Sequence, residues 1–169
     1  DLRSISINGG SSKALNYGIC SNISKSDKMT VIGRNTQDPA RWKRYKGGTA
    51  GELWIDIKKD FNFKKLIHIN GNMACPMIID SKIYFISDHE GIGNLYSCDN
   101  KGNNLKQHTF HKNYYARNAS TDGKKIVYHS GADLYIYDFS STKKLDNSYN
   151  SGFTKKTRKF DSTFYSLES

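Results

Sequence analysis

A short basic segment near residue 40 carries the side chains best suited to bind a ligand. Cations alternate there with aromatic residues, in the order Arg41, Trp42, Lys43, Arg44, Tyr45 and Lys46. Arginine can bind a carboxylate or a phosphate through two parallel hydrogen bonds, and an aromatic ring can cover the apolar part of a ligand. Three interpretations stay open: a protein interface anchored by a buried Trp42, contact with peptide carboxylates, or a grip on nucleic acid.

Side chains that could catalyse a reaction are present, but not in a catalytic pattern. A nucleophilic serine needs a base that a third group orients, and no Gly-x-Ser-x-Gly turn occurs. Asp88, His89 and Glu90 lie together at the expected end of a strand, where turn formation explains the cluster without a catalytic role. His108 and His111 would point to opposite faces of a strand, which is unsuited to a shared metal, and we expect His68 and His129 to pack within strands. The sequence predicts no catalytic residue, metal or cofactor in this chain.

Charge and cysteine content narrow the class of protein. Lysine and arginine number 26 against 16 acidic residues, so the net charge is +10. This charge suits an anionic partner or simply a soluble basic surface, because the lysines are scattered. No apolar run is long enough to span a membrane. Three widely spaced cysteines indicate neither a disulfide framework nor a zinc site, so we expect a cytoplasmic protein.

Short strands that recur along the chain must position these side chains. A leucine followed by an aromatic residue occurs at Leu53, Leu95 and Leu134, at intervals of 42 and 39 residues. Two strand-like segments precede each pair and one follows it, with polar turns between them. The expected strands are Leu15–Ser21, Met29–Gly33, Leu53–Ile55 and Phe63–Ile69; Cys75–Ile79, Ile83–Ser87, Leu95–Ser97 and Leu105–Phe110; and Tyr115–Ser120, Ile126–Ser130, Leu134–Ile136 and Lys143–Leu145.

Four strands repeating about every 40–45 residues are typical of β-propeller blades. A β-sandwich is the alternative, but it requires no fixed repeat. We therefore predict an all-β fold, with the whole chain forming one partial propeller domain. Three four-stranded antiparallel blades are expected at about 14–69, 73–110 and 114–146. Residues 1–10 and 147–169 belong to flanking blades or linkers, with Ser4–Ile7 as the last strand of a preceding blade.

The basic segment lies in an insertion within the first blade. Twenty positions separate Gly33 from Leu53, whereas the matching intervals in the other two blades are 8 and 4. Insertions in repeat proteins form loops on one face, which is often the binding face. The loop is therefore the expected contact site of the chain.

Four stretches of the sequence resemble a known family. These are Gly33–Thr36, Arg41–Thr49, Ile83–Ser97 and Thr121–Lys125, and they are similar to the six-bladed N-terminal propeller of tricorn proteases. The resemblance implies that the chain is a fragment of a six-bladed propeller. It also implies a large cytoplasmic archaeal serine peptidase that assembles into a homo-hexamer and trims oligopeptides released by the proteasome for aminopeptidases to finish.

The resemblance places the catalytic serine, histidine and acid in other domains of that peptidase, and none of them has a counterpart in this sequence. The propeller is expected to act as a non-catalytic channel, gate and scaffold. Its expected partners are the remaining blades and the catalytic domains of the parent chain, together with oligopeptide substrates. The alternative is a propeller scaffold that binds protein or RNA and has no peptidase attached.

Overall fold

The computed structural model describes residues 2–36 and 43–147 of the chain. Every helix or strand in these two ranges is a β-strand, which confirms the prediction of an all-β fold. The described part of the chain contains no helix long and apolar enough to cross a membrane.

Twelve of the strands form three four-stranded antiparallel sheets. The first sheet contains β3 (Asn22–Lys25), β4 (Thr30–Arg34), β5 (Glu52–Asp56) and β6 (Lys64–Lys65). The second contains β7 (Met73–Ile79), β8 (Lys82–Ser87), β9 (Asn94–Cys98) and β10 (Lys106–Gln107). The third contains β11 (Ala116–Thr121), β12 (Ile126–Ser130), β13 (Asp133–Tyr137) and β14 (Thr142–Lys144). In each sheet the strands lie side by side in chain order.

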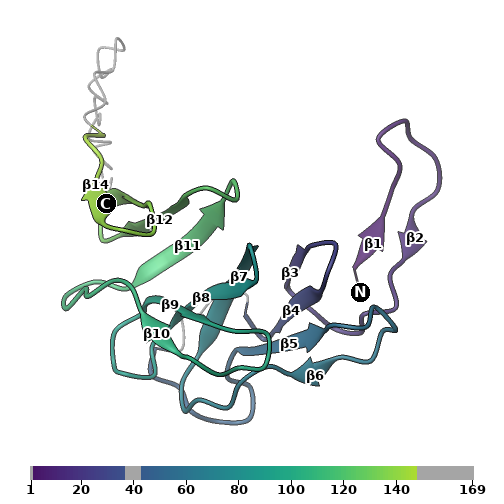
Figure 1. Cartoon of the computed structure of the whole chain (residues 1–169), viewed down its shortest axis with the longest axis horizontal. Helices are drawn as coiled ribbons and strands as arrows, with labels where there is room; N and C mark the ends of the chain where they lie inside the picture. The colour runs from purple at the N-terminus through teal and green to yellow at the C-terminus, as the bar shows by residue number, and fades with distance from the viewer. Residues whose placement is uncertain (1, 37–42, 148–169) are drawn as a thin grey trace, which may run out of the picture.

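The three sheets are arranged like the blades of an incomplete fan (Figure 1). Their first strands, β3, β7 and β11, lie toward the centre, and their last strands, β6, β10 and β14, lie at the rim. This arrangement confirms three blades of a β-propeller.

Neighbouring blades are held together by two apolar layers. Val31 and Leu53 of the first blade pack with Phe85 of the second, and Ile86 of the second packs with Ile126 of the third. Side chains alternate between the two faces of a strand, so β8 supplies residues to both layers. The apolar sequence of β8 predicted burial on both faces, and the middle blade is covered on both sides as expected.

The first predicted strand of the first blade is wrong. The innermost strand is β3 at Asn22–Lys25, not Leu15–Ser21. Gly18 lies in the left-handed region at φ 72°, which breaks an extended conformation. Tyr17 instead packs against the rings of Phe61 and Phe63, with ring centroids 5.8 and 5.3 Å apart. This stretch is therefore a connection that packs on the blade.

The N-terminal strand is also shorter than predicted. Only Ser4 of the expected Ser4–Ile7 strand lies in β1 (Arg3–Ser4), which pairs with β2 (Lys13–Ala14). The chain turns where the Gly9 N–H donates to the Ser6 carbonyl, and Ile7 is fully exposed. The outer strands β6 and β10 are likewise only two residues long.

His108 lies between the second and third blades and makes the structure sensitive to acid. Its Nε2 is 2.7 Å from Ser97 Oγ and its Nδ1 is 2.8 Å from Tyr137 Oη. Burial, reinforced by Lys106 and Lys82, lowers the pKa of His108 from 6.5 to about 4. The unfolded chain therefore binds a proton more readily between these values, and folding stability is lost as pH falls from about 6.5 to about 4.

We expect His108→Gln to reduce this acid sensitivity. Because the imidazole is only half buried, solvent screening limits its contribution to about 1–2 kcal/mol. Urea unfolding of the chain at pH 7 and pH 4.5 would measure the difference, with His68→Gln as a matched change at an exposed histidine. An equal loss of stability on acidification in wild type and His108→Gln would contradict the assignment.

Candidate functional site

The described half of the insertion crosses from its own blade to the next one. The Arg44 backbone N–H donates to Asp88 Oδ2 at 2.9 Å, and its side-chain Nε–H donates to the Gly91 carbonyl at 3.1 Å. Both acceptors lie at the hairpin between β8 and β9. The loop between β4 and β5 is thereby fixed to the second blade.

Asp88 is the centre of this attachment. The residue is 4% exposed, and its carboxylate accepts hydrogen bonds from the Asn72 backbone at 2.7 Å and the Asn72 side chain at 3.2 Å, as well as from the Arg44 backbone. The Tyr115 hydroxyl approaches the same carboxylate at 3.5 Å. The Asp88 carbonyl does accept the Gly91 N–H within the hairpin, so a turn is present. Sequence reasoning missed the larger role of the side chain, which ties three segments together.

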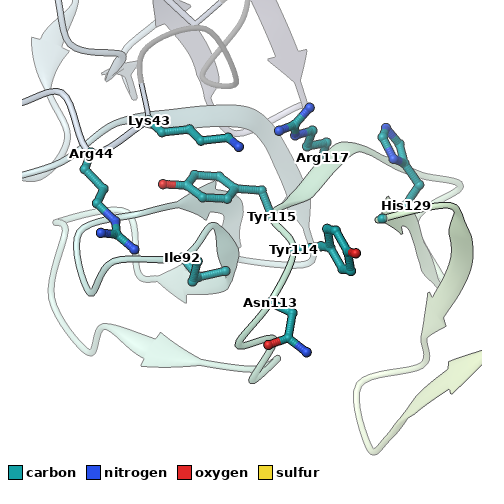
Figure 2. A pocket seen from close by; sticks show the side chains of 9 residues that line it. Lys43, Arg44, Ile92, Asn113, Tyr114, Tyr115, Arg117 and His129 are labelled. Carbon is teal, nitrogen blue, oxygen red and sulfur yellow. The ribbon is translucent and has the colours of Figure 1, made fainter.

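A pocket of about 460 Å³ opens next to the attached loop. Four connections meet there: the β4–β5 loop, the β8–β9 hairpin, the segment between β10 and β11, and the β12–β13 turn. Figure 2 shows how its side chains surround the hollow. The pocket is lined by Lys43, Arg44, Ile92, Asn113, Tyr114, Tyr115, Arg117, His129 and Gly131.

Tyr115 forms one wall of the pocket and is held rigidly. The side chain is 6% exposed, and its hydroxyl donates to the Gly91 carbonyl at 3.0 Å, the same oxygen that Arg44 contacts. A Cβ at Gly93 would lie 2.7 Å from the Tyr115 ring, so this close packing requires glycine. Burial raises the pKa of the Tyr115 hydroxyl, which therefore stays protonated and can donate.

The lining of the pocket carries a net positive charge. Lys43 Nζ lies 5.4 Å from the centroid of the Tyr115 ring, and Arg117 Cζ lies 5.9 Å from the same centroid. Arg44 adds a third cation, and no carboxylate lines the pocket. None of the three forms an ion pair with another residue in the described part of the chain. The arrangement can therefore attract an anionic group and cover its apolar neighbour with a tyrosine ring.

The six residues singled out in the sequence do not all reach this pocket. Lys43 and Arg44 line it, whereas Tyr45 and Lys46 do not. Tyr45 is half buried and its hydroxyl accepts a hydrogen bond from Thr49 at 3.2 Å, while Lys46 is exposed. Arg41 and Trp42 lie outside the described residues. The loop thus contributes two cations, and the aromatic wall comes from a different blade.

The histidines occupy separate environments. His108 contacts Ser97 and Tyr137, whereas His111 Nε2 lies 2.9 Å from Tyr128 Oη. His129 lies half buried on β12. The prediction that His68 packs within a strand is wrong, because His68 is exposed and follows the end of β6. Nowhere in the described ranges do three or more metal-binding side chains gather.

Comparison with known proteins relates the chain to one family. Residues 1–143 match the family described as the tricorn protease N-terminal beta propeller domain. The tricorn protease homolog of Saccharolobus solfataricus is 46% identical over 158 residues, which cover 92% of this chain and 15% of that protein. The tricorn protease of Thermoplasma volcanium is 44% identical over 140 residues, which cover 81% of this chain and 13% of that protein.

The fold agrees with a solved structure from the same group. The crystal structure of the tricorn protease superposes with a TM-score of 0.82 at 33% sequence identity. The match covers 90% of this chain and 15% of that chain. The sequence therefore spans about one seventh of the length of the proteins it resembles.

Proposed function

Because the chain belongs to the tricorn protease family, as a segment of its N-terminal β-propeller, we propose that it is a non-catalytic channel, gate and scaffold of a serine peptidase. In this proposal the parent protein is a cytoplasmic homo-hexamer that degrades oligopeptides released by the proteasome and passes its products to aminopeptidases. The remaining blades and the catalytic domains are its immediate partners. The 41–46 loop is assigned to contact with peptides or with a neighbouring domain.

The positive pocket is the observation that carries this proposal. Lys43, Arg44 and Arg117 converge where four connections between strands meet on one face of the blades. Cations concentrated in a concave surface raise the local concentration of anionic ligands and accelerate their capture. Peptides with acidic side chains and free carboxyl ends are such ligands. A propeller that carries this pocket can therefore steer peptides toward a catalytic site elsewhere in the parent protein.

We expect neutralising the loop to slow the capture of acidic oligopeptides by the full-length protein. In Lys43→Gln/Arg44→Gln, which removes both cations that the loop contributes to the pocket, kcat/KM should fall about threefold to tenfold at low salt, with kcat little changed, and the difference should shrink as salt screens the charges. Steady-state hydrolysis of an acidic oligopeptide at low and high ionic strength measures this effect.

Lys101→Gln/Lys124→Gln is the matched control, because it removes two exposed cations from the turns between β9 and β10 and between β11 and β12. Equal kcat/KM in the loop variant and the control would contradict the steering role. Cleavage of the same peptide by residues 1–169 alone would contradict the non-catalytic assignment. Absence of hydrolysis by the full-length protein, together with tight RNA binding, would favour a binding scaffold instead.

A further inference from the structure

We propose that a second hollow, which adjoins the positive pocket, is a receptor for a neutral aromatic side chain of a bound peptide. Its lining contains the rings of His111, Tyr114 and Tyr135. Tyr114 would stack on the incoming ring, and Tyr135 would add a second aromatic contact. That the ligand is a peptide rests on the proposed function, whereas the preference for an aromatic ring rests on the lining of the hollow.

The hollow has the size of a small-ligand site. It measures about 560 Å³, within the range of about 300–1,000 Å³ typical of such pockets. It lies between the segment that joins β10 to β11 and the turn that joins β12 to β13. Asn113, Tyr114 and Gly131 border both this hollow and the positive pocket. The three cations of the positive pocket do not line the second hollow, so binding here is a separate property.

Tyr114 is exposed to solvent, yet its ring is held in place. The residue is 65% exposed. Its ring lies against Gly131, where an added Cβ would be 3.1 Å from a ring carbon, and the Ser130 hydroxyl donates to the Tyr114 carbonyl at 3.0 Å. Figure 2 shows the Tyr114 ring between Tyr115 and His129 of the third blade. A ring that is already positioned loses little conformational entropy when a ligand stacks on it, which favours binding.

The other two rings of the hollow belong to an ordered aromatic cluster. Tyr135 stacks on Tyr128 with ring planes 10° apart, and His111 meets Tyr135 edge to face at 4.9 Å. His111 Nε2 lies 2.9 Å from Tyr128 Oη. Burial lowers the pKa of His111, so its ring is neutral at neutral pH. Aromatic rings favour these stacked and perpendicular arrangements, and a bound ring can extend the cluster.

The charges of the lining favour a neutral ligand. Lys112 and Asp133 are the charged residues that border the hollow, one of each sign. The Asp133 carboxylate is paired with Lys144 Nζ at 2.8 Å, which leaves it less able to attract a cationic ligand. Binding of single-stranded nucleic acid commonly combines aromatic rings with a positive groove that follows the phosphates, and one lysine does not form such a groove. A neutral aromatic side chain therefore fits the hollow better than a lysine side chain or a nucleotide chain does.

Photocrosslinking in the full-length protein tests the inference. Each probe is an N-acetylated, C-amidated alanine peptide that carries one photoleucine next to one variable residue, so neither end of a probe is charged. The variable residue is phenylalanine, cyclohexylalanine, lysine or alanine. The protein is first treated with a fluorophosphonate to block hydrolysis, and mass spectrometry then locates the label.

We expect the phenylalanine probe to label residues 111–114 or 130–135 about threefold to tenfold more than the cyclohexylalanine probe, which has a similar size but no π-system. The lysine and alanine probes should label these residues least. Tyr114→Leu should lower labelling by the phenylalanine probe to the level of the cyclohexylalanine probe, and Tyr114→Phe should preserve it. Phe110→Leu is the matched control and should leave labelling unchanged, because Phe110 is 71% exposed but does not line the hollow.

Equal labelling by the phenylalanine and cyclohexylalanine probes would overturn the inference, as would undiminished labelling of a folded Tyr114→Leu variant. Stronger labelling by the lysine probe would also overturn it and assign the hollow to a cationic group. An RNA oligomer with a photoreactive uridine that labels these residues when the phenylalanine probe does not would assign the hollow to nucleic acid instead.

Hydrolysis of an oligopeptide by untreated full-length protein is measured in parallel, so that the two proposals can fail separately. Hydrolysis without label that depends on the aromatic residue contradicts only the receptor. Label that depends on the aromatic residue, without hydrolysis, contradicts only the proposed peptidase.

Discussion

Replacing Asp88 by alanine is expected to lower the free energy of unfolding by about 3 kcal/mol, because each hydrogen bond to a charged group contributes about 1.5–3 kcal/mol and the substitution removes several at once. The change would leave the Asn72 and Arg44 backbone N–H groups without their acceptor in a site that excludes water. The loop between β4 and β5 would lose its attachment to the second blade. Lys43 and Arg44 would then no longer be held in the pocket.

Urea unfolding measures the first effect, and kcat/KM of the full-length protein for an acidic oligopeptide measures the second. Asp122→Ala is the matched control, because the Asp122 carboxylate is exposed and accepts from the Lys124 and Lys125 backbone N–H groups in its own turn. Its loss should cost less than about 1 kcal/mol and leave the pocket intact. Similar destabilisation by the two substitutions would show that Asp88 does not anchor the loop.

The second large effect is expected at Gly51, where the loop joins β5. The Gly51 carbonyl accepts the Met73 N–H at 3.0 Å, so two blades meet backbone to backbone at this point. A Cβ added to Gly51 would overlap the Met73 carbonyl oxygen. The backbone of β7 is held by its pairing with β8 and has little room to retreat. We expect Gly51→Ala to destabilise the chain by about 2–3 kcal/mol, as overpacking does in other protein cores.

Gly48→Ala provides a control within the same loop, because nothing lies within 4 Å of the methyl group it would introduce. We expect Gly48→Ala to leave stability unchanged or to raise it slightly, by about 0.5 kcal/mol, through the lower entropy of the unfolded chain. Thermal and urea unfolding of both variants make the comparison. Equal free energies of unfolding for Gly51→Ala and Gly48→Ala would contradict the prediction, because they would mean that the two blades can move apart at Gly51 without loss of stability.

The strands that could be predicted from the sequence are those with strong apolar patterns. The apolar stretch Ile83–Ser87 corresponds to β8, whose buried residues face two neighbouring blades. β3 gave no such signal, because Asn22–Lys25 contains one apolar residue, Ile23, and its side chain is 39% exposed. Its position is decided by pairing with β4, which is a tertiary contact.

The candidate site could likewise be predicted only where a local sequence pattern marks its residues. The insertion length and the alternation of cations with aromatic rings indicated a binding loop, and two of its cations do line a pocket. Tyr115 and Arg117 lie about seventy positions further along the chain, with no local motif that marks them. They join Lys43 only because the segment between β10 and β11 returns to the face where the loop lies. The buried Asp88 carboxylate was missed for a similar reason, since its partners come from three separate segments.

The chain-order arrangement of strands has a consequence for how the protein is made. Each blade consists of consecutive segments, so a nascent polypeptide leaving the ribosome can complete one blade before the next has been translated. The newest blade then bares apolar side chains such as Ile86 and Leu95 until Ile126 and Tyr128 emerge to cover them. The rate of translation between successive blades therefore determines how long each apolar surface stays exposed and available for aggregation.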